Sequence, residues 1–248
     1  MSIGNKNIVL VMGKPNMGKS ASLMKMKNQD KMIYLNTDLK ELPFADNFIS
    51  NIEVADANDV LGYIEQIESA EKVEGAVLDT ITFLMSMYER QYVANATNGQ
   101  KAWGDYGNFY REFIHAIKSG TKDYAILAHE ESFLNEQSHQ MESKVPVKGS
   151  VGKTGVEADF TTILAAKQMP VSKLEEHAND LLHITDEERE DGLKYVFCTR
   201  VTKETAGEKM RSAIGLWDRK ELYIDNDLEQ VFQRLRDYYR TGKKQEAA

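Results

Sequence analysis

The first half of the chain alternates between short apolar runs and longer stretches that are suited to helices. Unbroken apolar runs are typical of strands that are buried on both faces of a sheet. Such runs occupy residues 7–12, 31–36, 74–80 and 123–130, with a shorter one at 51–56. Helix candidates are 20–28, 56–70, 81–96 and 104–120. This alternation predicts a parallel sheet with helices packed on its faces.

The second half of the chain has a different pattern. Residues 131–158 are polar and rich in Gly, Lys, Ser and Gln, which predicts a loop. Four short apolar runs follow and predict antiparallel strands added at one edge of the sheet, at 160–167, 181–185, 194–201 and 221–225. A closing helix is expected at 226–240. The predicted fold class is therefore α/β, with a mainly parallel central sheet, in one domain (1–240) followed by a flexible tail (241–248).

Composition narrows the classes of protein that fit this pattern. The chain has 248 residues and a formal net charge of −8. Because the overall charge is acidic, any contact with nucleic acid must be made by a local basic segment. Cys198 is the single cysteine, which excludes an intrachain disulfide and a multi-cysteine zinc site and fits a cytoplasmic protein. No apolar run approaches the length of a membrane span.

Residues 13–20 read GKPNMGKS and match the pattern G-x-x-x-x-G-K-[ST]. Its glycines let successive backbone N–H groups face one phosphate, Lys19 would reach the β- and γ-phosphates, and Ser20 would offer a hydroxyl to Mg²⁺. Because the motif follows an apolar run and precedes a helix candidate, we predict a site for ATP and Mg²⁺. The predicted nucleotide-binding residues are Gly13, Lys14, Pro15, Asn16, Met17, Gly18, Lys19, Ser20 and Ala21.

Polar residues that follow three later strands are candidates for the same site. Asp79 ends the run GAVLD and is predicted to hold Mg²⁺ with Ser20, although a solvated turn acid has the same pattern. Asp38 follows IYLNT and is a candidate base for hydrolysis, with Glu41 as its competitor. His129, in ILAHE, is expected at the carboxyl edge of the sheet, where it either senses the γ-phosphate or caps a strand.

Two cations in GEKMRS complete the candidate set. Lys209 and Arg211 are two residues apart, so on an extended segment they point to the same side. Such a pair suits charge stabilisation at a phosphate, including one in a neighbouring subunit, and a solvated charged hairpin is the alternative. The predicted catalytic residues are Lys19, Asp38, Asp79, His129, Lys209 and Arg211.

The order of these features resembles that of the RecA-core P-loop ATPases. The P-loop comes first, an acid follows the second strand, Asp79-Thr80 follows the third, and a polar residue follows the fourth. The strand end ILAHE, the Gly/Lys-rich segment after it and the late strands look most like the short, phage-encoded RecA-like proteins of strand annealing. The resemblance covers about residues 7–225. It implies a RecA-like fold and, for a phage protein, the host cytoplasm.

The resemblance also implies roles for single residues. Asp38 falls where RecA-like proteins place a catalytic glutamate, and it is one methylene shorter. His129 falls at the sensor position. Lys209 and Arg211 look like the K-x-R finger that reaches into an adjacent protomer. Residues 131–158 fall where the family has its DNA-binding loop, so the resemblance implies contacts to single-stranded DNA from Lys144, Lys148 and Lys153.

The implied function is an ATP-binding and ATP-hydrolysing protein of DNA recombination or single-strand annealing. It would assemble on single-stranded DNA as a ring or filament with ATP at the subunit interface, and a single-strand DNA-binding protein is a candidate partner. Two alternatives share the fold: a motor or loader ATPase of the helicase or packaging type, and a module in which ATP only switches assembly. A small-molecule kinase is a further alternative, but the Arg-rich lid usual in such kinases is not evident in the sequence.

Overall fold

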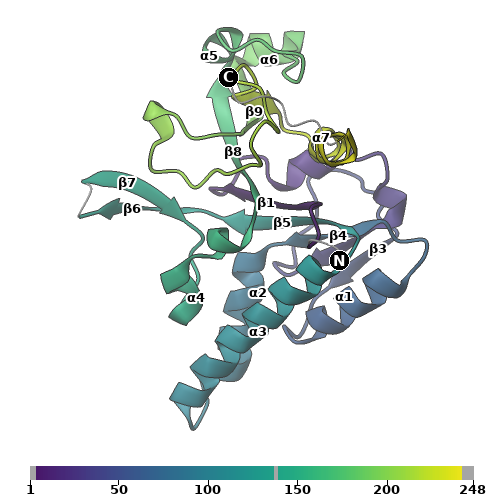
Figure 1. Ribbon diagram of the computed structural model, residues 1–248, viewed down its shortest axis with the longest axis vertical. Coiled ribbons are helices and arrows are strands. Elements are labelled where there is room, and N and C mark those ends of the chain that lie inside the picture. Colours follow the sequence, from purple (N-terminus) through teal and green to yellow (C-terminus); the bar gives the residue numbers. More distant parts are fainter. Residues whose placement is uncertain (1–3, 137–138, 242–248) are drawn as a thin grey trace.

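The computed structural model describes residues 4–136 and 139–241. These residues form an eight-stranded sheet in the order β10-β9-β8-β1-β5-β4-β2-β3 and a separate two-stranded hairpin (Figure 1). The sheet contains β1 (Ile8–Gly13), β2 (Met32–Asn36), β3 (Ser50–Glu53), β4 (Gly75–Asp79), β5 (Asp123–His129), β8 (Thr162–Pro170), β9 (Leu193–Cys198) and β10 (Tyr223–Asp225). The hairpin contains β6 (Glu131–Asn135) and β7 (Gln140–Lys144).

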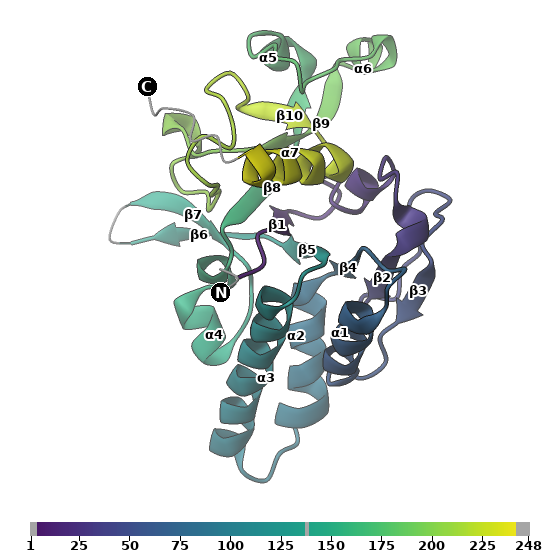
Figure 2. The same ribbon diagram turned by 45° about the vertical axis from the view of Figure 1, so that its right-hand side comes forward.

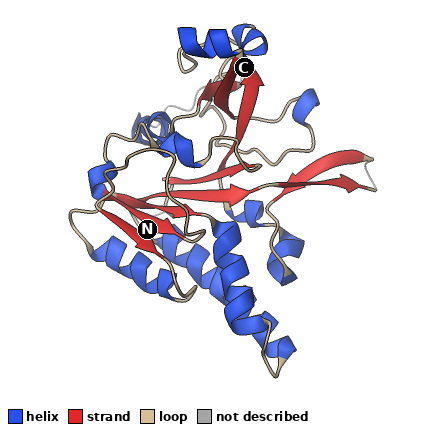
Figure 3. Cartoon of the chain, turned by 180° about the vertical axis from the view of Figure 1, so that it is seen from behind, coloured by secondary structure: helices blue, strands red, loops and turns tan. Residues whose placement is uncertain are grey.

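Helices cover both faces of the sheet. The α-helices are α1 (Asp59–Ser69), α2 (Ile81–Tyr88), α3 (Gly99–Ser119), α4 (Gly149–Thr154), α5 (Val171–Glu175), α6 (Asp186–Asp191) and α7 (Leu228–Thr241). A π-helical turn continues α2 (Glu89–Val93), and short 3₁₀ turns lie at Ser20–Leu23, Gln29–Lys31, Val156–Asp159 and Lys203–Thr205. Figures 2 and 3 show α1, α2 and α3 together on one face of the sheet, and α7 on the other.

Strand β1 is buried along its whole length because both faces of the sheet are covered. Ile8, Leu10 and Met12 pack into one core with α1, α2 and α3, and Val9 and Val11 pack into a second core with α7. Side chains alternate between the faces of a strand, so a strand covered on both sides needs apolar residues at every position. The unbroken apolar run at 7–12 is the sequence signal of this arrangement.

The strand directions confirm the predicted fold class. β1 is parallel to both β5 and β8, and the β5-β4-β2-β3 half of the sheet is also parallel. β9 is antiparallel to β8, and β10 to β9, so the antiparallel pairings lie in the C-terminal part. The run at 160–167, expected as an antiparallel addition, forms β8 and is parallel to β1, so that expectation is wrong for this strand. β5 lies between β1 and β4, with Gly13 opposite His129 and Asp79 opposite Leu127. The ends of these three strands therefore lie side by side.

The helix expected at 20–28 does not form. The structure has a single 3₁₀ turn there, Ser20–Leu23, and the chain then bends away. The side-chain amide of Gln29 donates to the carbonyl oxygens of Leu23 (2.8 Å) and Met24 (3.3 Å). A continuing α-helix would use these carbonyls as acceptors, so Gln29 satisfies them in place of backbone N–H groups.

Two further expectations are corrected in the second half of the chain. Residues 181–185 are not a strand: Leu182 and Ile184 pack into a small third core beside β8, β9 and β10, outside the sheet ladder. Residues 131–158 are not a structureless loop, because they contain β6, β7 and α4. The hairpin β6–β7 projects away from the main sheet (Figure 1).

The predicted tail (241–248) lies outside the described residues except for Thr241, with which α7 ends. None of the helices in 4–136 and 139–241 combines the length and apolarity needed to cross a membrane.

Candidate functional site

Parallel strands end at one edge of the sheet and bring polar residues to a shared cavity of about 510 Å³. In open α/β sheets, ligands bind outside the carboxyl ends of the strands. The predicted loop lines this cavity with Pro15, Asn16, Gly18, Lys19, Ser20 and Ala21. The later strands contribute Asp38, Glu41, Asp79 and His129. Lys14 and Met17 line a second cavity of about 430 Å³ instead.

The loop that follows β1 has the backbone that its glycines allow. Gly18 has φ = 83°, and Asn16 has φ = 63°, both in the left-handed region. A Cβ at Gly18 would lie 2.7 Å from the amide nitrogen of Asn226, which donates a hydrogen bond to the Gly18 carbonyl (2.7 Å). A Cβ at Gly13 would lie 2.9 Å from the carbonyl oxygen of Ala166 on β8. Both glycines are therefore required by conformation or by close packing.

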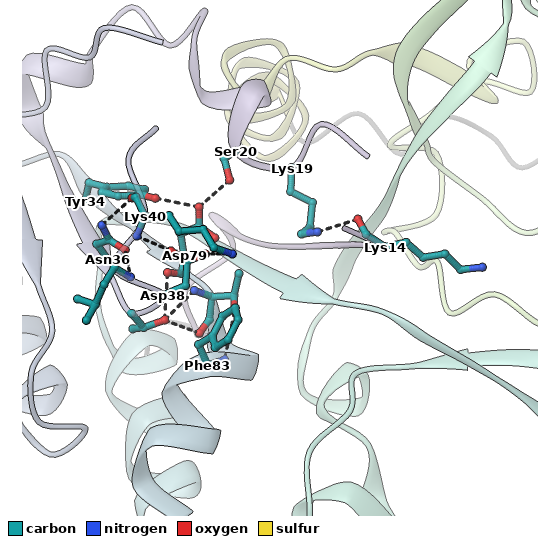
Figure 4. A network of polar contacts seen from close by, with 12 residues as sticks. Lys14, Lys19, Ser20, Tyr34, Asn36, Asp38, Lys40, Asp79 and Phe83 are labelled. Atoms are coloured by element: carbon teal, nitrogen blue, oxygen red, sulfur yellow. Dashed lines mark hydrogen bonds and ion pairs between the residues drawn. The ribbon is translucent and has the colours of Figure 1, made fainter. Parts of the chain in front are cut away.

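Lys19 is folded back over its own loop. Its ammonium donates to the carbonyl oxygens of Gly13 (2.9 Å) and Lys14 (3.0 Å), and the residue is 6% exposed (Figure 4). Burial lowers the pKa of Lys19, and the nearby carboxylate of Asp79 offsets part of this effect. The Lys19 ammonium is suited to bind an anion. Burial has removed much of its water, and hydrogen bonds to phosphate oxygens would take the place of that water.

Asp79 sits at the centre of the polar network in Figure 4. Its Oδ2 accepts hydrogen bonds from the Ser20 hydroxyl (2.7 Å) and from the Tyr34 hydroxyl (2.8 Å). Burial raises the pKa of Asp79, and these two hydrogen bonds lower it, with burial dominating. Mg²⁺ prefers a few protein oxygens alongside phosphate and water, so the hydroxyl of Ser20 and the carboxylate of Asp79 are a suitable pair. Bound there, the ion would neutralise charge on the phosphates.

Two residues that sequence reasoning missed support Asp79. Tyr34, on β2, is 1% exposed and reads as a core aromatic in the sequence. The Thr37 hydroxyl lies 3.0 Å from the Asp79 carbonyl oxygen and 2.9 Å from that of Thr80, and it accepts from the Thr80 N–H (2.8 Å). Tyr34 and Thr37 lie near Asp79 because β2 pairs with β4, and the periodicity of the sequence does not show which strands pair.

The two candidate bases lie in the segment after β2, and both line the cavity. The carboxylate of Asp38 is held locally: Oδ1 accepts from the Lys40 N–H (3.1 Å), and Oδ2 is paired with the Lys40 ammonium (3.3 Å). The side chain of Asp38 is 13% exposed. Glu41 is an exposed residue a few positions further along the same segment. The geometry keeps both Asp38 and Glu41 as candidates.

His129 ends β5 between the phosphate loop and Asp79. Its ring packs edge-on against Phe83 (5.2 Å between centroids), and its backbone N–H donates to the Thr82 hydroxyl (3.0 Å). Neither ring nitrogen has a hydrogen-bond partner among the described residues, and both are buried. Burial lowers the pKa of His129, with a further contribution from Lys19, so the imidazole is neutral at pH 7. A neutral ring can both donate and accept a hydrogen bond.

Lys209 and Arg211 do not line the cavity of this chain. The Lys209 ammonium is paired with Glu142 of β7 (3.0 Å). The backbone of Arg211 exchanges hydrogen bonds with Ile163 of β8 (2.8 and 3.2 Å). Their predicted action in a neighbouring protomer stays a prediction.

The lysines predicted to bind DNA lie on different elements. Lys144 ends β7, opposite Glu131, and its ammonium lies 4.8 Å from the centroid of the Phe133 ring. Lys148 is paired with Glu89 (2.8 Å), and Lys153 is exposed on α4. They all belong to the segment that leaves the cavity after His129.

The chain was compared with protein families, curated proteins and solved structures. Residues 5–205 match a family described as an AAA domain. Among solved structures, the chain is similar to a KaiC-like protein of the hyperthermophilic archaeon Pyrococcus horikoshii, with 11% identity and a TM-score of 0.44, covering 89% of each chain. No curated protein matches the sequence. The family match spans the phosphate loop, Asp79 and His129.

Proposed function

Because the chain belongs to the AAA domain family, and so carries a P-loop ATPase domain, we propose that it couples Mg²⁺-dependent ATP hydrolysis to the binding of single-stranded DNA. The biological setting that we propose is recombination or strand annealing. ATP would bind in the cavity at the end of β1, with its phosphates on the loop and on Lys19. Ser20 and Asp79 would hold the ion, and Asp38 or Glu41 would orient the attacking water.

The observation that carries the DNA part of the proposal is the course of the chain after β5. His129 lines the nucleotide cavity, and β6 begins two residues later, at Glu131. A neutral imidazole without a partner is suited to bind a phosphate oxygen. A shift of His129 on ATP binding would therefore be passed directly to the β6–β7 hairpin and to the lysines beyond it. This would give DNA binding that depends on the bound nucleotide.

DNA contact would be electrostatic and local. Lys144, Lys148 and Lys153 lie within ten residues, from the last residue of β7 to α4. Phe133, in β6, is the one Phe, Tyr or Trp residue within 131–158, and the Lys144 ammonium lies over its ring. We therefore expect phosphate contacts, with strong salt dependence, to outweigh base stacking.

Assembly belongs to the same proposal. Lys209 and Arg211 lie outside the cavity of their own chain, so a contact with a triphosphate would have to be made in the site of an adjacent protomer. In a ring or filament on single-stranded DNA, ATP would then sit at the subunit interface, and a single-strand DNA-binding protein is the proposed partner.

A second candidate is an ATP-gated assembly module with little hydrolysis. The contact that favours this candidate is the ion pair between Asp38 and Lys40. This pair restricts the Asp38 carboxylate, which is already one methylene shorter than a glutamate, from turning toward an attacking water. Such a protein would bind ATP and assemble, but it would turn over slowly.

The test replaces Lys144, Lys148 and Lys153 with alanine together. A matched control removes three exposed lysines elsewhere, Lys27, Lys72 and Lys220, so that both variants lose the same charge. We expect the first variant to lose single-stranded DNA affinity and to show a flatter salt dependence, and the control to stay near the wild type. ATP affinity should be unchanged in both.

Equal losses in the two variants would show that total charge, and not this segment, governs the contact. DNA affinity and salt slope equal to the wild type in the first variant would contradict the assignment of the segment.

A further inference from the structure

One wall of the cavity is an exposed aromatic ring that the proposed chemistry does not use. Two tyrosines line the cavity: Tyr34 is buried and bound to Asp79, whereas Tyr195 is 39% exposed. Tyr195 comes from β9, two places from β1 in the sheet order. Its neighbour two residues on, Phe197, packs in the core that α7 covers, so Tyr195 faces the same side of the sheet as α7.

The Tyr195 ring lies directly against the phosphate loop. A Cβ placed on Gly18 would come within 3.0 Å of the ring atom Cδ1, so the ring packs on the bare backbone of that glycine. Asn226 fixes the same glycine by its hydrogen bond to the carbonyl oxygen. The edge of the ring and the loop therefore form one continuous surface.

Ion pairs of a buried lysine anchor the strand that carries the ring. Lys194, the residue before Tyr195, is 5% exposed and contacts Glu188 (2.8 Å) and Asp225 (3.2 Å). Asp225 immediately precedes Asn226, which binds the loop. Buried, paired charges hold a fixed geometry, because breaking them leaves an uncompensated charge. Two contacts therefore hold Tyr195 beside Gly18: the ion pair of Lys194 with Asp225, and the hydrogen bond of Asn226 to the Gly18 carbonyl.

The sheet order separates the two ends of the cavity. Asp79 and His129 come from β4 and β5, on one side of β1, and Tyr195 comes from β9, on the other. Neighbouring strands are about 4.8 Å apart, which places β9 roughly 10 Å to the side of β1. A triphosphate on the loop, with its γ-phosphate toward Asp79 and His129, therefore directs its nucleoside toward Tyr195.

We propose that Tyr195 is the stacking platform for the nucleobase. This inference rests on the proposed ATP site and deepens it. Every base has a π-face, so the platform would favour nucleotides over bare polyphosphate without selecting strongly among bases. The loop would bind the phosphates, and the ring would supply the affinity for the nucleoside.

The test compares Mg²⁺-ATP with Mg²⁺-tripolyphosphate, which has the phosphates but no base, by calorimetric titration. Tyr195→Leu keeps bulk beside Gly18 but removes the π-face, and Tyr195→Phe keeps the ring. We expect Tyr195→Leu to weaken ATP binding by about 5- to 150-fold and to leave tripolyphosphate binding unchanged. Tyr195→Phe should bind both ligands like the wild type. Tyr92→Leu, at a tyrosine of similar exposure (37%) outside the cavity, is the matched control and should change neither.

The outcomes separate this inference from the proposed function. Equal weakening of ATP and tripolyphosphate in Tyr195→Leu would mean that the ring only supports the loop, and it would overturn the platform. Wild-type ATP affinity in Tyr195→Leu would also overturn the platform while leaving the ATP site intact. A wild-type protein that binds neither ligand would overturn the proposed function itself.

Discussion

The hydrogen bond from Tyr34 to Asp79 gives the sharpest prediction about the ion site. Asp79 is 4% exposed, and its Oδ2 accepts from Tyr34 (2.8 Å) and from Ser20 (2.7 Å). Tyr34→Phe removes one of these donors and leaves the buried ring in place. Hydrogen bonds to charged groups contribute about 1.5–3 kcal/mol. Losing this donor to the ionised carboxylate should therefore raise the pKa of Asp79 further in the variant.

The sign of the pH effect follows from the role of the carboxylate. In the proposed site, Asp79 would hold Mg²⁺ in its ionised form, so ATP hydrolysis should be lost as the pH falls through the pKa of Asp79. Burial already raises the pKa of Asp79 in the wild type, and Tyr34→Phe would raise it further. The acid limb of kcat/KM for ATP should therefore move to higher pH. A raised folded-state pKa also affects stability. As the pH rises from the pKa of the carboxyl in the unfolded chain to its higher pKa in the folded protein, the free energy of unfolding falls, and it should fall further in the variant than in the wild type.

The assay is the pH profile of ATP hydrolysis at saturating Mg²⁺ for the wild type and the variant. Tyr124→Phe is a matched control: Tyr124 is 2% exposed on β5, and its hydroxyl bonds Glu68 (2.7 Å), away from the cavity. The control should keep the wild-type acid limb. An unchanged acid limb in Tyr34→Phe would refute the reasoning that Asp79, tuned by Tyr34, is the group that titrates.

Two further predictions concern the base and the anchor of β9. Asp38→Asn should lower kcat by about 10²-fold or more, with Glu41→Gln near the wild type; the opposite result would assign the base to Glu41. Lys194→Met should lower the unfolding free energy by about 3 kcal/mol in urea titrations, because it removes the lysine cation from the buried Asp225 and leaves His183 as the side-chain partner of that carboxylate. Lys72→Met, at an exposed lysine, is the control, and equal stability of the two variants would show that the buried ion pair contributes nothing.

The sequence predicts the main strands well because burial on both faces leaves a strong signal. β1, β4 and β5 are unbroken apolar runs, and each is buried along nearly its whole length. The phosphate loop is equally visible, since its function requires particular residue types at fixed spacing. The positions of Asp79 and His129 in one cavity follow from the rule that parallel strands end at one edge.

The features that escaped prediction depend on contacts between distant segments. The 3₁₀ turn at Ser20–Leu23 does not continue as a helix, because the side-chain amide of Gln29 donates to the carbonyl oxygens at its end. Local helix propensity does not show this contact. Leu182 and Ile184 are apolar because they fill a small core and not because they form a strand. The β6–β7 hairpin has no clean alternation, and Leu134 and Met141 form an exposed cross-strand pair. Tyr34 and Tyr195 lie within apolar runs of the sequence, which is typical of core aromatic residues. Only the order of strands in the sheet shows that both line the cavity.

We propose that ATP bound at the P-loop drives single-stranded DNA binding through the segment after His129. The most direct test is the steady-state rate of ATP hydrolysis with and without single-stranded DNA, at low and moderate salt, with Lys19→Ala as the inactive reference. We expect a hydrolysis rate that Lys19→Ala abolishes and that DNA raises, and we expect the stimulation by DNA to fade as the salt concentration increases. A rate indifferent to DNA at both salt concentrations would contradict the coupling, and full turnover in Lys19→Ala would contradict the site itself.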